Sequence, residues 1–259
     1  TQALLHALGE GKGLALAHQF SHAFSAAYRE DFAPLVGAED AQVLATLSAD
    51  SPLAVKMYRP LDAPAGMLRL KLYNWTKVAL SDSLPVLERM GARVLDEHPY
   101  RIGKGAPAEA RWIHDLGLLL PVDTDFSAIR ARFESLFMQV WKGDVESDDL
   151  NRLLLQTSLG AREITVLRAY TRYFKQLGLP FSQAYIEAAL NRNVGIAQEI
   201  SALFVARFDP NFQGDRDEAR RLCRERIEQE LAAVESLDDD RILRQFYASV
   251  IATLRTNAW

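Results

Sequence analysis

The sequence predicts an α+β fold, in which a small antiparallel or mixed β-sheet with helices on one face is followed by an all-helical region. Apolar and polar residues alternate in "LAVKMYRP" (53–60) and in "LRLKLY" (68–73), which is the period of half-buried strands. From Thr124 onward the apolar residues recur every three to four positions, the period of helices. We therefore predict an N-terminal helical segment over residues 1–50, an α+β domain over 51–122 and a helical domain over 123–259.

The N-terminal segment predicts two helices. Leu16, Phe20, Phe24 and Ala27 form one stripe between Lys12 and Arg29, which indicates a single amphipathic helix over that range. A shorter helix is predicted near Glu39 to Leu47.

The two alternating segments predict a hairpin, because "LDAPAG" (61–66) between them contains a Pro and a Gly that suit a reversal. Their parity places the aliphatic residues on one sheet face. The other face would carry Lys56, Tyr58, Arg69, Lys71 and Tyr73. Two alternatives stay open for that second face: it is solvated, or it meets another subunit.

A helix should follow the hairpin, with Ser81 or Ser83 as its cap and Pro85 in its first turn. Its predicted buried stripe is Leu80, Leu84, Leu87 and Met90, and Gly91 supplies the left-handed residue that ends it. Residues 92–102 and 111–121 then read as strands, the second with Trp112, Leu116 and Leu118 on one face. The predicted order of elements is β-β-α-β-β.

The C-terminal region predicts a series of helices. The first has a stripe of Phe126, Ile129, Phe133, Leu136 and Val140, with Asp123 or Thr124 as cap and Gly143 as stop. Further helices are expected over 147–157, 161–177, 182–192, 196–207 and 215–234, and a last one after "LDDD" (237–240).

Composition excludes several classes of protein. The chain has 259 residues, 49% hydrophobic and 25% charged, with a net charge of -4, so bulk charge does not favour nucleic-acid binding. Its single cysteine, Cys223, excludes a disulfide framework, and no apolar run reaches the length of a membrane span. We expect a cytoplasmic protein and, because the chain begins with Thr, a piece of a longer one.

Motifs of catalytic or metal-binding sites fail on spacing. "GEGKG" (9–13) has no preceding strand, and "IGKGAP" (102–107) lacks the Ser or Thr of a phosphate-binding loop. His18 and His22 are one helical turn apart but have no third ligand nearby in sequence. The acidic runs 146–149 and 238–240 each suit a helix N-terminus better than a metal. We therefore predict no catalytic, cofactor-binding or metal-binding residue in this chain.

Several long stretches carry a resemblance to a known family. They are "FSHAFSAAYREDFAP" (20–34), "SPLAVKMYRPLDAPAG" (51–66), "LRLKLYNWTKVALSDSLPVLERMGARVLDEHPYRI" (68–102), "LNRLLLQTSLGAREITVLRAYTRYFKQLGLPFSQAYIEAAL" (150–190), "FVARFDP" (204–210) and "LDDDRILRQFYASVIATLRTN" (237–257). Over these the chain resembles the segment of the large bacterial NAD-specific glutamate dehydrogenases that precedes their catalytic domain.

The resemblance implies an ACT-like unit over residues 51–122, joined to helical segments with a regulatory or scaffolding role. The parent enzyme would use NAD to oxidise L-glutamate to 2-oxoglutarate and ammonium. The family's glycine-flanked catalytic lysine has no counterpart here, so the segment alone is not expected to be an enzyme. Its expected partners are the catalytic domain of the same chain and further copies of itself, with no nucleic acid and no membrane.

ACT modules often bind an amino acid in the loop between a strand and the following helix, which here is Asn74 to Asp82. Candidate effector-binding residues are Asn74, Thr76, Lys77, Ser81 and Asp82. The loop departs from the ligand-binding pattern, because "TKVALSD" (76–82) has no glycine to let a backbone approach an α-amino acid closely. An amino-acid effector module and a pure oligomerisation module therefore remain alternatives to a scaffold.

Overall fold

The computed structural model describes residues 2, 10–20, 22–103, 110–121 and 124–258, and its internal contacts divide the chain into two compact units. The sheet unit comprises Thr1–Glu88 and Ala92–Phe126, and the helical unit comprises Arg89–Gly91 and Ser127–Trp259. None of the described helices combines the length and the apolar character that crossing a bilayer requires.

The sheet unit is built on four antiparallel strands, β1 (Leu53–Tyr58), β2 (Met67–Asn74), β3 (Arg93–Ile102) and β4 (Arg111–Leu119). Their order across the sheet is β1-β2-β4-β3. The register pairs Lys56 with Lys71 and Lys71 with Asp115, so these three residues stand in one row on one face. The predicted hairpin, the two later strands and the α+β class are confirmed.

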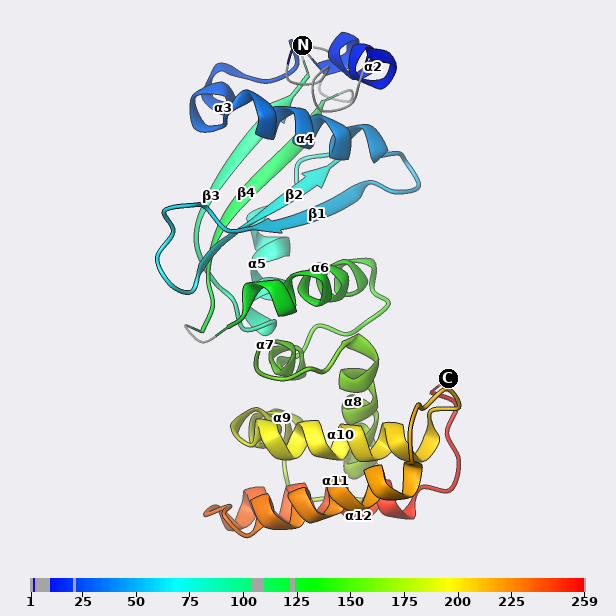
Figure 1. Cartoon of the computed structure of the whole chain (residues 1–259). Helices are drawn as coiled ribbons and strands as arrows, with labels where there is room; N and C mark the ends of the chain where they lie inside the picture. The colour runs from blue at the N-terminus through cyan, green and yellow to red at the C-terminus, as the bar shows by residue number, and fades with distance from the viewer. Residues whose placement is uncertain (1, 3–9, 21, 104–109, 122–123, 259) are drawn as a thin grey trace. The chain divides into compact units, whose positions relative to one another are not determined.

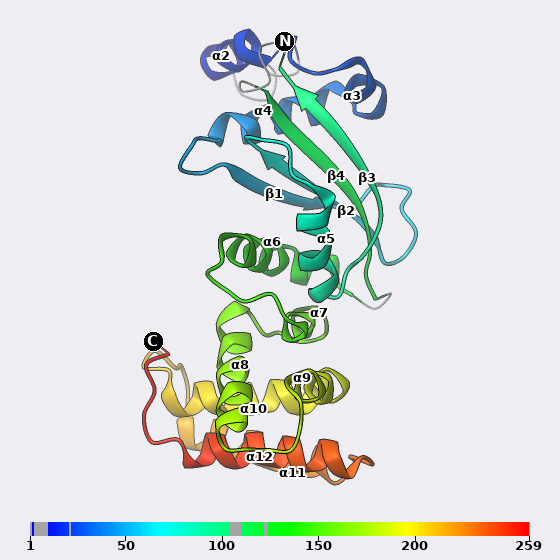
Figure 2. The ribbon, with the colours of Figure 1, turned by 180° about the vertical axis from the view of Figure 1, so that it is seen from behind.

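Helices lie on both faces of this sheet, which Figures 1 and 2 show from opposite sides. Helix α5 (Leu80–Arg89) lies on the aliphatic side, where Leu70, Leu72 and Leu116 are buried. Helix α4 (Pro34–Thr46) crosses the other side. The prediction that the face with Lys71 and Tyr73 is solvated or meets another subunit is thus wrong, because the chain's own N-terminal helices cover it.

The predicted single helix over residues 12–29 is also wrong, since the structure has α2 (Glu10–Phe20) and α3 (Ala26–Asp31) instead. The segment between them pairs with the end of β3. Phe24 forms an isolated antiparallel bridge with Ile102, and the Gly103 N–H donates to the Ala23 carbonyl at 2.9 Å. Ser25 then caps α3 by accepting from the Tyr28 N–H. Pairing with a distant strand overrides the local helical pattern.

Helix α5 begins earlier than predicted. Ser81 and Ser83 lie inside it rather than at its cap, and Pro85 is past the first turn. The Asp82 N–H already donates to the Ala79 carbonyl at 3.0 Å, which closes a turn that contains Ser81 and precedes Ser83. Leu80 is 39% exposed and is not part of a buried stripe. The C-terminal end is as predicted, with Met90 buried and Gly91 at a φ of 85°.

The helical unit contains α6 (Phe126–Lys142), a 3₁₀ turn η2 (Asp149–Arg152), α7 (Leu153–Gln156), α8 (Ala161–Gln176), α9 (Gln183–Arg192), α10 (Val194–Phe208), α11 (Arg216–Leu231) and α12 (Leu237–Ala252). Figure 1 shows α8 running steeply across the direction of α10 and α12. The expected start of the last helix after residue 240 is wrong, because Ser236 caps α12 through the Asp239 N–H and the acidic run forms its first turn.

Of the two residues predicted to cap α6, Asp123 lies outside the described residues and Thr124 precedes the helix by two positions. Gly143 has a φ of 80°, so it ends α6 in the left-handed conformation as predicted.

Candidate functional site

The polar face of the sheet holds a buried carboxylate that no sequence pattern singled out. Asp40, on α4, is 1% exposed and accepts hydrogen bonds from Tyr28 Oη at 2.5 Å, Lys71 Nζ at 2.5 Å and Tyr73 Oη at 2.7 Å. The Lys71 ammonium also lies 3.8 Å from the centre of the Phe32 ring, a cation–π contact. This cluster ties α3 and α4 to the middle of β2.

A second buried carboxylate, Asp115 on β4, neighbours the first. Tyr58 Oη donates to both of its oxygens at 3.1 and 3.0 Å, and Arg69 Nε donates to one of them at 2.9 Å. Arg69 also reaches Asp96 at 2.9 Å. Asp96 lies over Gly117, where a Cβ would come within 2.6 Å of the Asp96 carboxylate, so glycine is what makes room for this pair.

Burial governs the ionisation of this face. It raises the pKa of Asp115 above its ordinary value, against the opposing pull of Arg69. Burial likewise raises the pKa of Tyr28, Tyr58 and Tyr73, with the neighbouring carboxylates adding to the effect. The tyrosines therefore stay protonated and donate. Both carboxylates already have a cation and a hydroxyl as partners, which makes the cluster a structural element rather than a site for a ligand.

The predicted effector loop, Asn74 to Asp82, leaves β2 and enters α5. Asn74 is 7% exposed, and its Oδ1 accepts from the Thr76 N–H at 3.4 Å. The remaining candidates, Thr76, Lys77, Ser81 and Asp82, are all exposed. The structure therefore places one of the five predicted residues inside the fold and four on its surface.

Two further hydrogen bonds hold the loop. The Trp75 N–H donates to the Pro52 carbonyl at 2.9 Å, and the Val78 N–H donates to His114 Nε2 at 3.3 Å. Since Nε2 accepts, the ring proton lies on Nδ1, which contacts Glu97 Oε1 at 2.5 Å. Buried His114 on β4 thus links β3 to the loop, a role that its position in the sequence gave no sign of.

The weaker sequence candidates have ordinary structural environments. His18 lies in α2 and His22 beyond its end, so they do not share one helix. No group of three or more potential metal ligands occurs among the described residues. Cys223 is buried on α11, where burial raises its pKa to about 11. Most of the glycine run 102–107 lies outside the described residues.

The acidic runs form ion pairs as well as caps. In the first, Asp148 accepts from the Leu150 N–H and from buried Arg168, whose Nε lies 2.5 Å from Oδ2. In the second, Asp239 receives Arg192 Nε at 2.9 Å and Nη2 at 2.7 Å. These arginines lie 20 and 47 residues away in sequence, which is why the runs alone did not reveal them.

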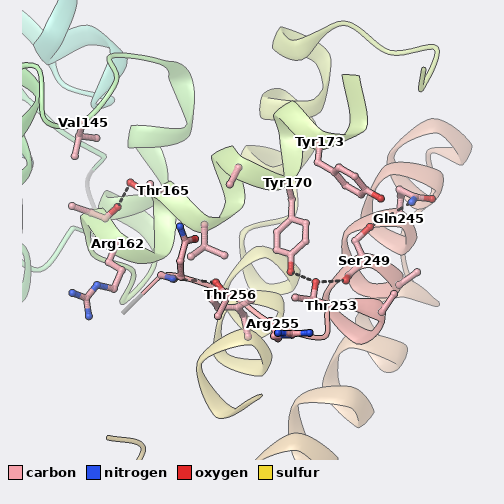
Figure 3. Close-up of a pocket in the computed structure, with 18 of the residues that line it drawn as sticks. Val145, Arg162, Thr165, Tyr170, Tyr173, Gln245, Ser249, Thr253, Arg255 and Thr256 are labelled. Atoms are coloured by element: carbon pink, nitrogen blue, oxygen red, sulfur yellow. Dashed lines mark hydrogen bonds between the residues drawn. The ribbon is translucent and has the colours of Figure 1, made fainter. Parts of the chain in front are cut away.

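The helical unit contains a pocket of about 900 Å³. Its walls come from α8, from α12, from the segment after α12 and from the end of α6, and Phe204 of α10 contributes to its lining. Figure 3 shows Tyr170 and Tyr173 projecting from α8 toward Gln245 and Thr253. Helical periodicity predicted the elements but not this hollow, because its lining combines residues from 139 to 258.

Three domain models of one family match the chain in succession. Glutamate dehydrogenase helical motif 2 matches residues 3–47, the ACT3 domain matches 52–130, and helical motif 3 matches 145–210. The ACT3 match covers the four strands and α5 of the sheet unit.

Curated relatives agree with the domain models. The NAD-specific glutamate dehydrogenase of Pseudomonas aeruginosa is 39% identical over 256 residues, that of Halomonas elongata is 37% identical over 261, and that of Mycobacterium tuberculosis is 34% identical over 258. The matches cover 96%, 98% and 95% of this chain but only 16%, 16% and 15% of the relatives. The chain is therefore similar, over nearly its whole length, to a segment of the NAD-specific glutamate dehydrogenases, and it matches the glutamate dehydrogenase ACT3 domain and helical motifs 2 and 3.

Proposed function

We propose that this chain is a non-catalytic regulatory and scaffolding segment of a cytoplasmic NAD-dependent glutamate dehydrogenase. The parent enzyme would convert L-glutamate and NAD to 2-oxoglutarate, ammonium and NADH, as a step of amino acid catabolism. The observation that carries the proposal is the succession of three glutamate dehydrogenase domain models along one chain that spans 15–16% of its relatives.

The construction of the sheet unit supports a scaffold. Asp40 joins two helices to the sheet, and Asp115 with Arg69, Tyr58 and Asp96 joins the four strands, so both clusters consist of charges that are already satisfied within the unit. Buried ionic clusters of this kind fix one arrangement of the elements, because any other arrangement leaves a charge without its partner.

Activity measurements test the non-catalytic part. The 259-residue chain should form no NADH from glutamate and NAD, whereas the full-length enzyme containing it should do so. NADH formation by the purified chain alone would refute the proposal.

The scaffolding part is tested in the full-length enzyme with Lys71→Met. Loss of the ammonium that pairs with Asp40 should reduce assembly, measured by light scattering, together with the amount of active enzyme. The KM for glutamate of the enzyme that still assembles should not change. Lys56→Met is the matched control, since Lys56 on β1 makes a partly exposed pair with Glu39, the neighbour of Asp40 on α4. Normal assembly of the Lys71 variant would count against a scaffold.

The exposed loop favours a second candidate function, an amino-acid effector site. Lys77 and Asp82 are both exposed and offer the opposite charges that an α-carboxylate and an α-ammonium require. Thermal shift titration of the chain over the common amino acids tests it, with Lys77→Gln and Asp82→Asn as variants. Stabilisation of about 2.7 kcal/mol is expected at a hundredfold excess over Kd, and its absence for every amino acid would remove this candidate.

A further inference from the structure

The pocket of the helical unit lies outside the predicted effector loop and outside the clusters of the sheet unit. Its volume of about 900 Å³ is within the range of sites that enclose a small organic molecule. Ala169 and Tyr173 on α8, and Ala248 and Ala252 on α12, line it with exposed side chains. The small alanine side chains on α8 and α12 leave the pocket open, and aromatic side chains such as Tyr173 form part of its wall.

Tyr170 supplies an aromatic wall. Its hydroxyl lies 2.6 Å from Thr253 Oγ1, which donates its own proton to the Ser249 carbonyl at 2.8 Å. The tyrosine must therefore be the donor in this pair, and it has no proton left for a ligand. Burial raises its pKa, so the ring stays neutral. Together with Phe204, whose ring meets Tyr170 edge to face at 6.1 Å, it offers an apolar surface.

The charged groups around the pocket are mainly cationic. Among the described lining residues, Arg162 and Arg255 carry guanidinium groups and Asp144 is the only carboxylate. Figure 3 shows Arg255 next to Thr253 and Thr256, on the segment that follows α12.

A third guanidinium lies behind that segment. Arg207 Nη2 donates to the Ile251 and Thr253 carbonyls, both at 3.1 Å. Burial lowers the pKa of Arg207, and the neighbouring Arg224 and Arg220 lower it further.

We propose that the pocket between α8 and α12 binds a small organic anion with an aromatic or aliphatic body. The anionic group lies at Arg255, and the body lies against Tyr170 and Tyr173 of α8. Thr256, near Arg255 in Figure 3, adds a neutral hydrogen-bonding group, which suits a carboxylate that accepts more than one hydrogen bond, and Gln245 lies near Tyr173 at the other end of the site. The site does not depend on the function proposed above, because all the residues that line it belong to the helical unit.

The probe is 1-naphthoate, compared with 1-naphthamide, which has the same body without the charge. Calorimetric titration and ligand-observed NMR with the 259-residue chain should show binding of the acid and at least tenfold weaker binding of the amide. Absence of naphthoate binding at about 10 mM would overturn the proposal, because it would mean a Kd too weak for a specific small-ligand site. Equal affinity of the acid and the amide would overturn it as well.

Two variants locate the site. Arg255→Gln removes the charge at an exposed position and should weaken naphthoate binding about tenfold, with little effect on the amide. Ala248→Trp fills the space and should abolish binding of both compounds. Matched controls are Arg241→Gln, on α12 but outside the pocket, and Ala184→Trp, at an exposed position of α9.

Circular dichroism checks that each variant is folded, and the two controls should bind like the wild type. Equal weakening by Arg241→Gln would show that bulk charge rather than this pocket is responsible. Unchanged binding in both Arg255→Gln and Ala248→Trp would place the ligand elsewhere and overturn the assignment.

Discussion

The two units of this chain bury charge in different ways. In the sheet unit, Asp40 and Asp115 lie between layers, and their partners are a cation and tyrosine hydroxyls from neighbouring strands and helices. In the helical unit, Asp148 and Asp239 lie at helix N-termini. Asp148 caps η2 by accepting from the Leu150 N–H and pairs with Arg168. Asp239 lies in the first turn of α12 and pairs with Arg192. A carboxylate between layers depends on its cation, whereas one at a helix end also has the helix dipole.

The largest effect is expected from Lys71→Met in the sheet unit. Removing one partner of a buried pair should lower the free energy of unfolding by about 3–5 kcal/mol. Lys56→Met breaks the partly exposed pair with Glu39 of α4 and should lower the free energy of unfolding by no more than about 1 kcal/mol. Denaturant unfolding measures both. Equal costs for the two variants would show that burial of the Lys71 pair has no energetic consequence.

A somewhat smaller loss is expected for Arg168→Met in the helical unit. Arg168 is 3% exposed and reaches Asp148 and Asn151, but Asp148 keeps its hydrogen bond from the Leu150 N–H. We expect a cost of about 3 kcal/mol, at the lower end for a broken buried pair. Arg172→Met, on the same helix and with an exposed pair to Glu146, is the control and should be nearly neutral. A cost for Arg168→Met above that of Lys71→Met would reverse the comparison.

The contribution of Asp239 to stability should depend on pH. Hydrogen bonds from Arg192 hold its pKa below the ordinary value, so its ionised form stabilises the folded state. That contribution is complete above the ordinary pKa and is lost as the pH falls through the lowered one. Asp239→Asn should therefore cost about 1 kcal/mol at neutral pH and almost nothing near pH 2. A cost of Asp239→Asn that does not change between neutral pH and pH 2 would contradict the assignment.

The smallest effect concerns Gly117→Ala. The added Cβ displaces the Asp96 carboxylate from Arg69, but Asp96 is 40% exposed, so the loss should stay below about 1 kcal/mol. In an Asp96→Ala background the same change should be neutral or slightly stabilising, because alanine suits a strand better than glycine. Unfolding of the four proteins of this cycle measures the coupling, and additive effects would show that Asp96 does not respond to the Cβ.

Periodicity predicted most of the fold because each strand and most helices bury one regular face. The alternation of residues 68–73 placed Arg69, Lys71 and Tyr73 together, and the register confirms it. What it could not predict is which partner covers that face, since Asp40 lies on a helix whose own pattern gives no reason to expect a buried acid. The breaks at Ala23 and Phe24 depend on pairing with Ile102 and Gly103, and local sequence contains no information on that pairing.

The candidate sites were predictable to a smaller degree. The loop from Asn74 to Asp82 could be named because it joins a strand to a helix, whereas His114, which anchors it, lies 36 residues from Val78. The pocket between α8 and α12 arises only from tertiary packing. The effector residues Thr76, Lys77, Ser81 and Asp82 stay a prediction that awaits titration.

The salt link between Asp40 and Lys71 has a practical consequence for anyone who wishes to produce the ACT3 region by itself. A fragment that starts at residue 51 would keep the Lys71 ammonium and the Tyr73 phenol but would lack the acid that neutralises the first and accepts a hydrogen bond from the second. Its exposed surface would then be basic and aromatic, a combination that promotes adhesion to other macromolecules. Such adhesion could be mistaken for partner recognition, so a shortened form should begin before α2 instead.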